Sequence, residues 1–286
     1  MSWLPRPLDP GGYFCWLLVI SLACLLLERL RPWRRAQRLL RRGLAQDVFW
    51  LVFNGHFAGV GVSYLAAVSL AWASPAFDWA SSVRALGGAP LWVQGLTAFV
   101  LKDLLEWGVH NLLHRVPLLW ELHKVHHSIE ELDWIGNFRF HWGEIVLYRA
   151  LTYFPLALLG TDPRVLLVLA GVSTAIGHLN HSNLDVSWGP LRYVLNSPRM
   201  HVWHHDLSWP PDRKSGVNFA IGLSLWDWLF GTAHWPSREE APTQQPARLG
   251  FAGMDRYPAR LLDRVLFPLS LLWARPAPHP HDIKRG

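Results

Sequence analysis

The chain has 286 residues, of which 51% are hydrophobic and 18 are tryptophan, and its mean hydropathy is +0.12. These values argue against an ordinary soluble domain and indicate a membrane protein. The formal net charge of +6 comes largely from arginines next to apolar segments, which favours contact with anionic lipid over nucleic acid. The only cysteines, Cys15 and Cys24, exclude a disulfide framework, a thiolate metal site and a CxxC redox motif.

Three uncharged segments predict membrane-spanning helices, because a helix needs about 20 apolar residues to cross a bilayer. They run from residue 11 to 27, from 48 to 77 and from 85 to 101. The first has a weak basic leader and no small-residue cleavage pattern, so we interpret it as a retained helix rather than a secretory signal. Residues 150–161 and 165–184 predict a membrane hairpin that either crosses fully or only enters the bilayer.

Seven arginines between residues 29 and 42 set the expected orientation. Short arginine-rich loops stay on the cytoplasmic side, which places the N-terminus outside and the residues from His110 onward in the cytoplasm. Because the hairpin begins and ends on that same side, all the clustered histidines can meet at one cytoplasmic face. The expected fold class is therefore an all-α integral membrane protein with about three spanning helices, a membrane hairpin and a cytoplasmic, histidine-rich helical cap.

The same reading divides the chain into three parts. Residues 1–99 are expected to hold the N-terminal membrane helices and the arginine-rich loop, and residues 100–235 the histidine-rich domain. Residues 236–286 form a tail in which residues 261–273 carry an apolar face and predict a short interfacial helix.

Eleven of the fifteen histidines lie between His110 and His205, at the spacings of metal ligands. The HxxxH motif at 110–114 places two histidines on one helix face, although such a pair at a helix end also occurs without metal. The HxxHH motif at 123–127 recurs at 201–205. Imidazoles packed together twice have little structural rationale unless they bind transition metals, whose commonest ligand is neutral imidazole.

The number of histidines favours two metal ions over one. Tetrahedral zinc takes about four ligands, and catalytic zinc keeps about three from the protein. The chain has no HExxH sequence, which argues against the common zinc protease helix. Haem needs one or two axial ligands and does not explain a doubled HxxHH motif. A dinuclear iron centre explains the pattern best.

In chain order, these motifs resemble the histidine boxes of the fatty acid hydroxylase and sterol desaturase superfamily of membrane di-iron enzymes. The run DLLEWGVHNLLHRVPLLWELHKVHHS, from Asp103 to Ser128, is similar to the first two boxes, and residues 198–205 are similar to the third. Shorter matches to the same family are Arg139 to Glu144, His181 to Asn183, and Asn218 to Thr232.

The resemblance covers roughly residues 100–235 and departs from the family at two positions. Asn111 stands where arginine often follows the first histidine, and Trp142 stands where proline is usual. Neither is an expected ligand, so both departures concern the surroundings of the site or the substrate.

The resemblance implies that nine histidines ligate metal: His110, His114, His123, His126, His127, His181, His201, His204 and His205. His178 lies one helical turn before His181 and is counted as a tenth ligand, with a pore-facing or hydrogen-bonding role as the alternative. His141 is assigned to the surroundings of the metals or the mouth of the substrate site. The histidines assigned outside the site are His56, His234, His279 and His281.

Metal-bound histidines need a carboxylate or carbonyl partner on the other ring nitrogen. The acidic residues nearest the boxes are Asp103, Glu106, Glu144, Asp206 and Asp227. Asp206 and Asp227 are the first expected partners, with solvation at the surface as the alternative. Arg139 and Arg199 are expected either to hold a lipid headgroup or to pair with these acids.

The implied reaction is oxygen activation at two iron ions, followed by hydroxylation or desaturation of an unactivated C–H bond in a fatty acyl chain, sterol or isoprenoid. Electrons are expected from a separate donor such as cytochrome b5 or a ferredoxin, because the sequence has no haem module, no GxGxxG fingerprint and no cysteine cluster. The alternatives are a non-redox membrane protein that uses the same ligands for zinc, and a metal-binding or transport protein. Transporters usually place ligands near the bilayer midplane, which makes the last alternative less favoured.

Overall fold

The computed structural model describes residues 12–58, 61 and 85–270. Among these residues the backbone forms helices and loops, with isolated bridges in place of strands, which confirms the expected all-α class. The helices are α1 (Tyr13–Leu30), α2 (Leu44–Val52), η1 (Phe53–Phe57), α4 (Leu91–Arg115), α5 (Pro117–His127), η4 (Trp134–Phe138), α6 (Trp142–Leu158), α7 (Pro163–His181), η5 (Gly189–Tyr193), α8 (Pro198–His204), α9 (Leu225–Leu229), η6 (Met254–Arg256) and α10 (Leu261–Ser270).

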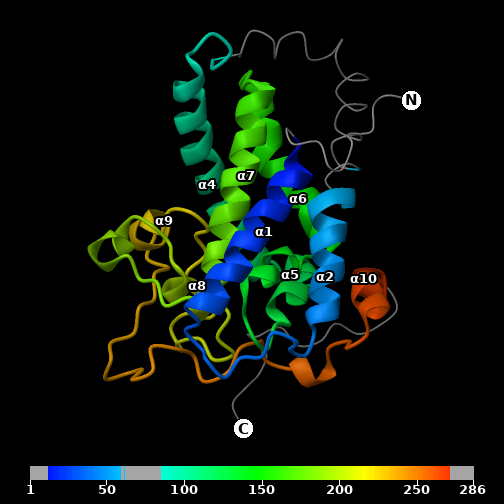
Figure 1. The fold of residues 1–286 in the computed structure, drawn as a ribbon, viewed down its shortest axis with the longest axis vertical. Helices are drawn as coiled ribbons and strands as arrows, with labels where there is room; N and C mark the ends of the chain where they lie inside the picture. The colour runs from blue at the N-terminus through cyan, green and yellow to red at the C-terminus, as the bar shows by residue number, and fades with distance from the viewer. Residues whose placement is uncertain (1–11, 59–60, 62–84, 271–286) are drawn as a thin grey trace.

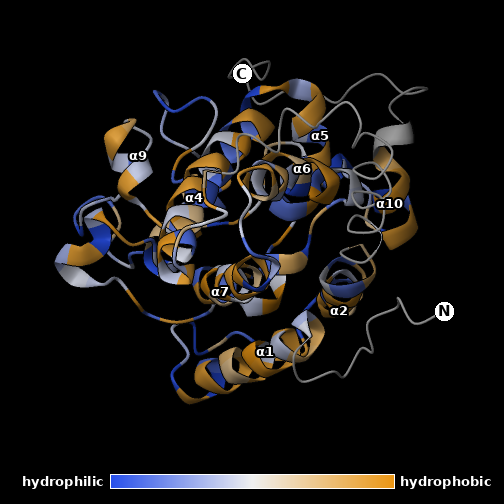
Figure 2. Ribbon diagram, turned by 90° about the horizontal axis from the view of Figure 1, so that it is seen from above, coloured by the Kyte–Doolittle hydropathy of each residue, from blue (hydrophilic) through white to orange (hydrophobic). Residues whose placement is uncertain are grey.

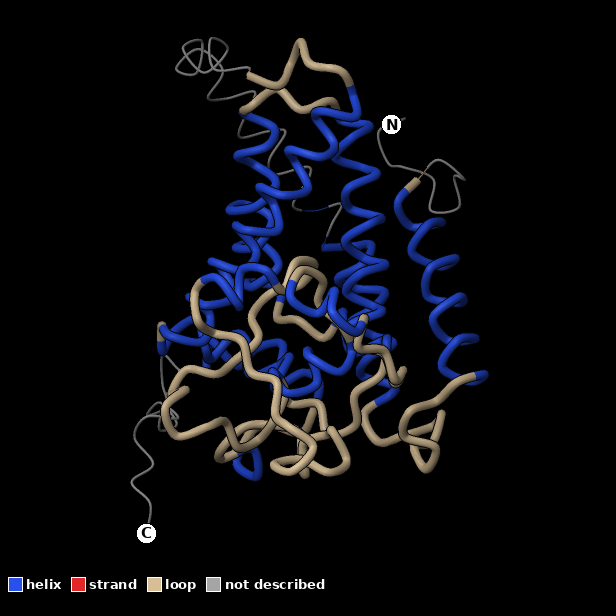
Figure 3. The backbone as a smooth tube through the Cα atoms, turned by 90° about the vertical axis from the view of Figure 1, so that its left-hand side faces the viewer, coloured by secondary structure: helices blue, strands red, loops and turns tan. Residues whose placement is uncertain are grey.

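The long helices and the loops occupy opposite ends of the molecule. Helices α1, α4, α6 and α7 rise through the upper part, whereas α5, α8 and the long loops make up the lower part (Figures 1 and 3). Helix α1 is coloured mainly as hydrophobic along its length, including its outer side (Figure 2). By length and composition, α1 is the one described helix that qualifies as a membrane span.

The expected spanning segments appear to different extents. The first is α1, and the third begins α4, which continues to Arg115 and so carries two histidines beyond the apolar part. The start of the second lies in α2 and η1, while its residues 59–60 and 62–77 lie outside the described part of the chain. Helix α4 also runs through the expected domain boundary at residue 100. The number of spans and the division into domains therefore stay predictions.

Prolines determine where three of the helices begin. Pro117, Pro163 and Pro198 each occupy the first turn, where a missing N–H costs no hydrogen bond. Proline disfavours helical geometry in the residue before it, so Val116 is extended (φ −93°, ψ 116°) and separates α4 from α5. The Ser197 side chain accepts a hydrogen bond from the Met200 amide at 3.3 Å and caps α8. These breaks turn the histidine-bearing helices back toward one another.

The expected hairpin forms as α6 and α7, which pack against α4, and α1 packs along α7. The Asp162 carboxylate accepts the Arg164 amide at 2.8 Å and caps α7 directly after the turn. Glycine allows the close packing of α1, because a Cβ atom at Gly171 would lie 2.6 Å from the Trp16 ring.

A buried network of four charged residues ties the arginine-rich loop to the histidine-bearing part. The Arg41 guanidinium lies 2.7 Å from the Asp47 carboxylate and 2.5 Å from that of Asp133. Arg139 donates to Asp47 and, at 3.0 Å, to the Ser128 carbonyl. Arg139 therefore pairs with Asp47, which precedes the histidine boxes in the sequence, and not with the acids expected for it.

The tail returns to the body of the molecule. The predicted helix at 261–273 forms as α10 over its described residues, and it packs against α5. Leu261 and Val265 join an apolar cluster around the buried Trp50 and Trp120. The contact of α10 with a bilayer stays a prediction.

We predict that Asp47→Ala lowers the free energy of unfolding by about 3–5 kcal/mol, because it leaves two buried arginines without their shared carboxylate. The measurement is denaturant unfolding of the protein in detergent. Asp212→Ala is the control, since Asp212 is 74% exposed in its pair with Arg213 and its loss should cost less than about 1 kcal/mol. Equal losses in the two variants would contradict a structural role for the network.

Candidate metal centre

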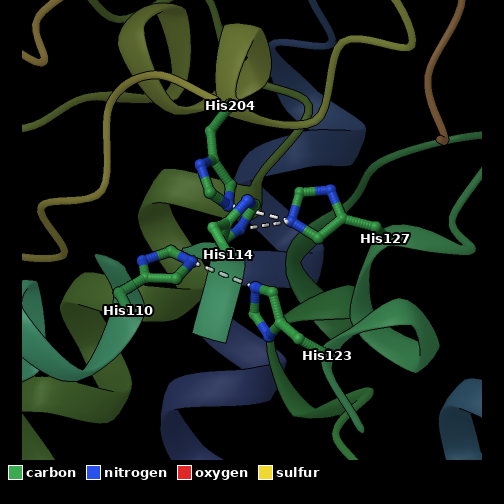
Figure 4. A group of neighbouring side chains, drawn as sticks. All are labelled: His110, His114, His123, His127 and His204. Carbon is green, nitrogen blue, oxygen red and sulfur yellow. Dashed lines mark hydrogen bonds between the residues drawn. The ribbon is translucent and has the colours of Figure 1, made fainter. Parts of the chain in front are cut away.

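Nine buried histidines converge as two neighbouring groups. In each group the potential ligand atoms lie within 4.8 Å of one another. The first group, drawn in Figure 4, consists of His110, His114, His123, His127 and His204. The second group consists of His126, His181, His201 and His205. These are the nine histidines that the family resemblance implied.

Helical periodicity explains most of this division. Residues four apart on a helix share a face. His110 with His114 on α4 and His123 with His127 on α5 are such pairs, and both belong to the first group. The fourth residue of each HxxHH motif belongs to the other group from its first and fifth residues: His126 lies in the second group and His204 in the first. Each motif thus contributes to both groups.

The ring nitrogens within a group are spaced as ligands of one ion. The Nε2 atoms of His110 and His123 lie 3.1 Å apart, as do those of His127 and His204. In the second group, His181 Nε2 lies 3.1 Å from His201 Nε2. Two nitrogens at about 2.1 Å from one ion, separated by an angle between octahedral and tetrahedral values, lie about 3.0–3.4 Å apart.

The other ring nitrogen of several histidines is fixed by the protein. The Nδ1 atom of His110 donates to the Phe219 carbonyl at 2.7 Å, and that of His204 donates to the Val217 carbonyl at 2.8 Å. His123 Nδ1 donates to the Glu144 carboxylate at 2.7 Å. These bonds hold each proton on Nδ1 and leave the Nε2 lone pair directed into the group, as metal ligation requires.

Both ring nitrogens of His205 are buried without a hydrogen-bond partner among the described residues. An unsatisfied buried polar group costs about 1–3 kcal/mol, and coordination of a cation removes that cost for the ligating nitrogen. Together with the spacing of the nitrogens and a donor set made of imidazole, this shows that the residues fit two transition-metal ions.

Burial keeps the imidazoles neutral. Desolvation lowers the pKa of His127, His201, His204 and His205 well below the usual value, and the neighbouring histidines lower it further. The same causes lower the pKa of His123. The site at neutral pH therefore offers the unprotonated form that metals bind.

His178, expected from the sequence as a tenth ligand, lies outside both groups. Its Nε2 atom is 3.1 Å from the Ser21 hydroxyl, and its Nδ1 atom is 2.9 Å from the Asn137 amide nitrogen. It therefore links α1 to the end of η4, which matches the hydrogen-bonding alternative. His141 donates from Nε2 to the Val265 carbonyl at 2.9 Å and accepts the amide of Gly143 at 3.0 Å, so it caps α6 and contacts α10.

The acidic residues support the histidines in two ways, by a direct hydrogen bond or by bonds to the backbone amides of a neighbouring loop. Glu144 alone of the expected acids bonds a ligand histidine directly. Asp227 accepts the amides of Phe219 and Ala220, both at 2.9 Å, and so fixes the carbonyl that holds His110. Asp103 accepts the amides of Gly222 and Leu223, both at 2.8 Å.

Asp206, expected beside Asp227 as a first partner, makes no hydrogen bond to a described histidine and accepts the Ser208 amide at 3.1 Å. The partners that sequence reasoning missed are the backbone carbonyls of Gly177, Val217 and Phe219. Because every residue has a backbone carbonyl, residue type gives no signal for these partners. The Asn218-Phe219 match to the family is the one sequence feature that lies near them.

Comparisons with known proteins agree with this geometry. The profile of the family described as fatty acid hydroxylase matches residues 95–232. An ornithine lipid hydroxylase, OlsE, from Rhizobium tropici is 31% identical over 80% of this chain and 72% of its own length. No solved structure matches.

More distant relatives include an alkylglycerol monooxygenase from Xenopus tropicalis, 28% identical over 73% of this chain and 44% of its own length. A methylsterol monooxygenase from Arabidopsis thaliana is 23% identical over 47% of this chain and 44% of its own length. This chain thus spans less than half the length of these two relatives.

We predict that His126→Ala and His204→Ala each lower the metal content from about two ions per chain to about one, because each removes a ligand from a different group. Elemental mass spectrometry of the purified protein measures this content. His234→Ala is the matched control, since His234 belongs to neither group and should leave the content unchanged. A full metal complement in both ligand variants would contradict the two-ion site.

We also predict that Asp227→Ala weakens metal binding by about tenfold to a hundredfold, because the Phe219 carbonyl loses its anchor and His110 loses its fixed orientation. Competition with a chelator measures the affinity. Asp206→Ala is the control and should change it by less than about threefold, since Asp206 bonds no histidine. Equal effects would show that the Phe219 carbonyl is not what positions His110.

Proposed function

Because the chain belongs to the fatty acid hydroxylase family and is an iron-dependent lipid oxygenase, we propose that its nine clustered histidines hold two iron ions and that it hydroxylates a C–H bond of a membrane lipid. The observation that carries this proposal is the partition of the histidines into two buried groups of five and four with converging ring nitrogens. One group alone would supply enough ligands for one ion, so the second supports a dinuclear site.

The proposed reaction is balanced by an external reductant. One C–H bond, one dioxygen molecule, two electrons and two protons yield one alcohol and one water. Bound iron would supply the redox chemistry that activates dioxygen, and the protein supplies binding, orientation and electrostatics. The electrons are proposed to come from a separate one-electron carrier such as cytochrome b5 or a ferredoxin. Hydroxylation is favoured over desaturation because it requires the removal of a single hydrogen, and several relatives are named hydroxylases or monooxygenases.

The protein's own contribution includes the exclusion of water. Three aromatic rings surround His114, with centroid distances of 4.9 Å for Trp120, 5.5 Å for Trp209 and 5.0 Å for Phe219. The Phe140 ring stacks on His126 at 4.6 Å. A dry surrounding strengthens electrostatic interactions within the site and limits side reactions.

Glu144 is the only carboxylate among the described residues that bonds a ligand histidine. It is fully buried, and its Oε2 atom has no hydrogen-bond partner within the part of the chain that the structure describes. We propose that it accepts the His123 Nδ1 proton in a hydrogen bond and so keeps the Nε2 lone pair of His123 available to a metal ion.

The proposed substrate enters from the bilayer. We propose a multi-pass protein with its metal site on the cytoplasmic face, supported by the arginine-rich loop after α1 and by the place of the histidine-bearing helices α5 and α8 in the lower part of the molecule (Figure 1). A lipid would then keep its polar end at the interface while the target carbon reaches the site. Ornithine lipids are the first substrates to test, because the relative that covers 80% of this chain bears that name.

The test is incubation of the iron-loaded protein with lipid extract, a reduced carrier and isotopically labelled dioxygen. We expect a lipid product that contains one labelled oxygen atom, with no such product from His204→Ala. Elemental and mass analysis together separate the alternatives. Zinc that persists after iron reconstitution, without labelled product, would assign the site to a non-redox zinc protein.

A further inference from the structure

A hollow of about 530 Å³ opens on the surface at α8, the helix that also carries His201. We call it the basic hollow, and its lining includes Arg192, Arg199, Trp235, Arg238 and Glu240. Its walls come from η5, from α8 and from the segment that follows α9. None of these side chains belongs to the two histidine groups.

The cations of the basic hollow exceed its carboxylates. Three arginines line it, against the single carboxylate of Glu240, which accepts the Ser237 amide at 2.8 Å. Asp185 lies beside the hollow and accepts a hydrogen bond from Arg199. The Arg192 Nε atom is buried without a hydrogen-bond partner among the described residues, so it leaves a cationic donor unused. A ligand with several negative charges would complement this surface.

Aromatic side chains accompany these arginines. The Arg192 guanidinium lies 5.0 Å from the Tyr193 ring centroid and 5.2 Å from that of Trp235. Arg199 lies 5.7 Å from the Trp33 ring, which comes from the arginine-rich loop. Beside the hollow, Leu191 is 56% exposed and Tyr193 46% exposed. Arginine with tryptophan and tyrosine is the composition that dominates binding energy in protein interfaces.

The hollow and the metal centre share helix α8. Arg199 is part of α8 and stands two residues before His201, a member of the second histidine group. The Trp203 ring contacts His234 at 5.7 Å, and His234 adjoins Trp235 of the hollow.

We propose that the basic hollow docks the acidic one-electron carrier protein that reduces the metal centre. The inference rests on the proposed function, because a non-redox zinc protein would need no reductant. At each encounter the carrier loses one electron and the metal centre gains one, so two encounters supply the two electrons consumed with each dioxygen. A protein is favoured over a lipid surface, because an acidic protrusion can fill a concave hollow whereas a bilayer surface is flat.

The test uses the full-length, iron-loaded protein in nanodiscs and an acidic plant-type ferredoxin as the probe. The double variant Arg199→Glu/Arg238→Glu should bind ferredoxin at least about tenfold more weakly at low salt, with a shallower dependence on ionic strength. The matched control, Arg164→Glu/Arg256→Glu, makes the same charge change at side chains that are 76% and 82% exposed elsewhere. It should stay within about twofold of the wild type.

A variant that gains affinity guards against damage to the fold. Asp185→Asn removes the carboxylate that neutralises Arg199 and should tighten ferredoxin binding by about threefold. Equal losses in the two double variants, or no change in the first, would overturn the proposal. Unchanged ferredoxin binding with weaker binding to phosphatidylglycerol vesicles would assign the hollow to lipid and overturn it as well. Binding is measured without turnover, so absence of a lipid product would count against the proposed function alone.

Discussion

The structure depends on the burial of nine neutral imidazoles in one place. Desolvation holds the pKa of histidines such as His127 and His204 well below the usual value, so these rings stay neutral. Their Nε2 atoms lie 3.1 Å apart. Hydrogen bonds between the rings satisfy only some of these nitrogens, and cations would satisfy them together. Bound metal ions would therefore stabilise the folded chain, since several of these ring nitrogens are buried without a hydrogen-bond partner among the described residues.

Two levels of hydrogen bonding hold those imidazoles in position. At the first level, backbone carbonyls and Glu144 accept the Nδ1 protons. At the second, carboxylates hold the loops that present the carbonyls: Asp227 binds the amides of Phe219 and Ala220, and Asp103 binds those of Gly222 and Leu223. An acid can thus be essential to the geometry of a metal site without touching a histidine, because a loop is only as rigid as the groups that bind its amides.

Much of this site follows from the sequence, and the rest depends on tertiary structure. The spacing of four residues predicts that His110 and His114 share a group, and the same spacing pairs His123 with His127. The sequence does not say that His126 joins a different group, because this requires the position of α7 relative to α5. His178 shows the converse, since its spacing from His181 is that of a ligand pair while its ring nitrogens bond Ser21 and Asn137. The starts of α5, α7 and α8 were predictable from proline, whereas the pairing of Arg139 with Asp47 joins residues far apart in the chain and has no local signal.

The two departures from the family pattern separate what the metal site requires from what varies around it. The Asn111 side-chain amide donates to the Trp107 carbonyl at 3.0 Å, within its own helix, and forms no hydrogen bond to a ligand histidine among the described residues. The Trp142 indole donates at 3.1 Å to the Val265 carbonyl, the same atom that His141 bonds. A proline at residue 142 has no side-chain donor and would leave α10 with one contact fewer. This departure therefore strengthens the attachment of the tail helix α10 to the start of α6. The same first turn of α6 carries Glu144, whose carboxylate bonds His123 of the first histidine group. The tail contributes to the architecture of the site even though it supplies no ligand.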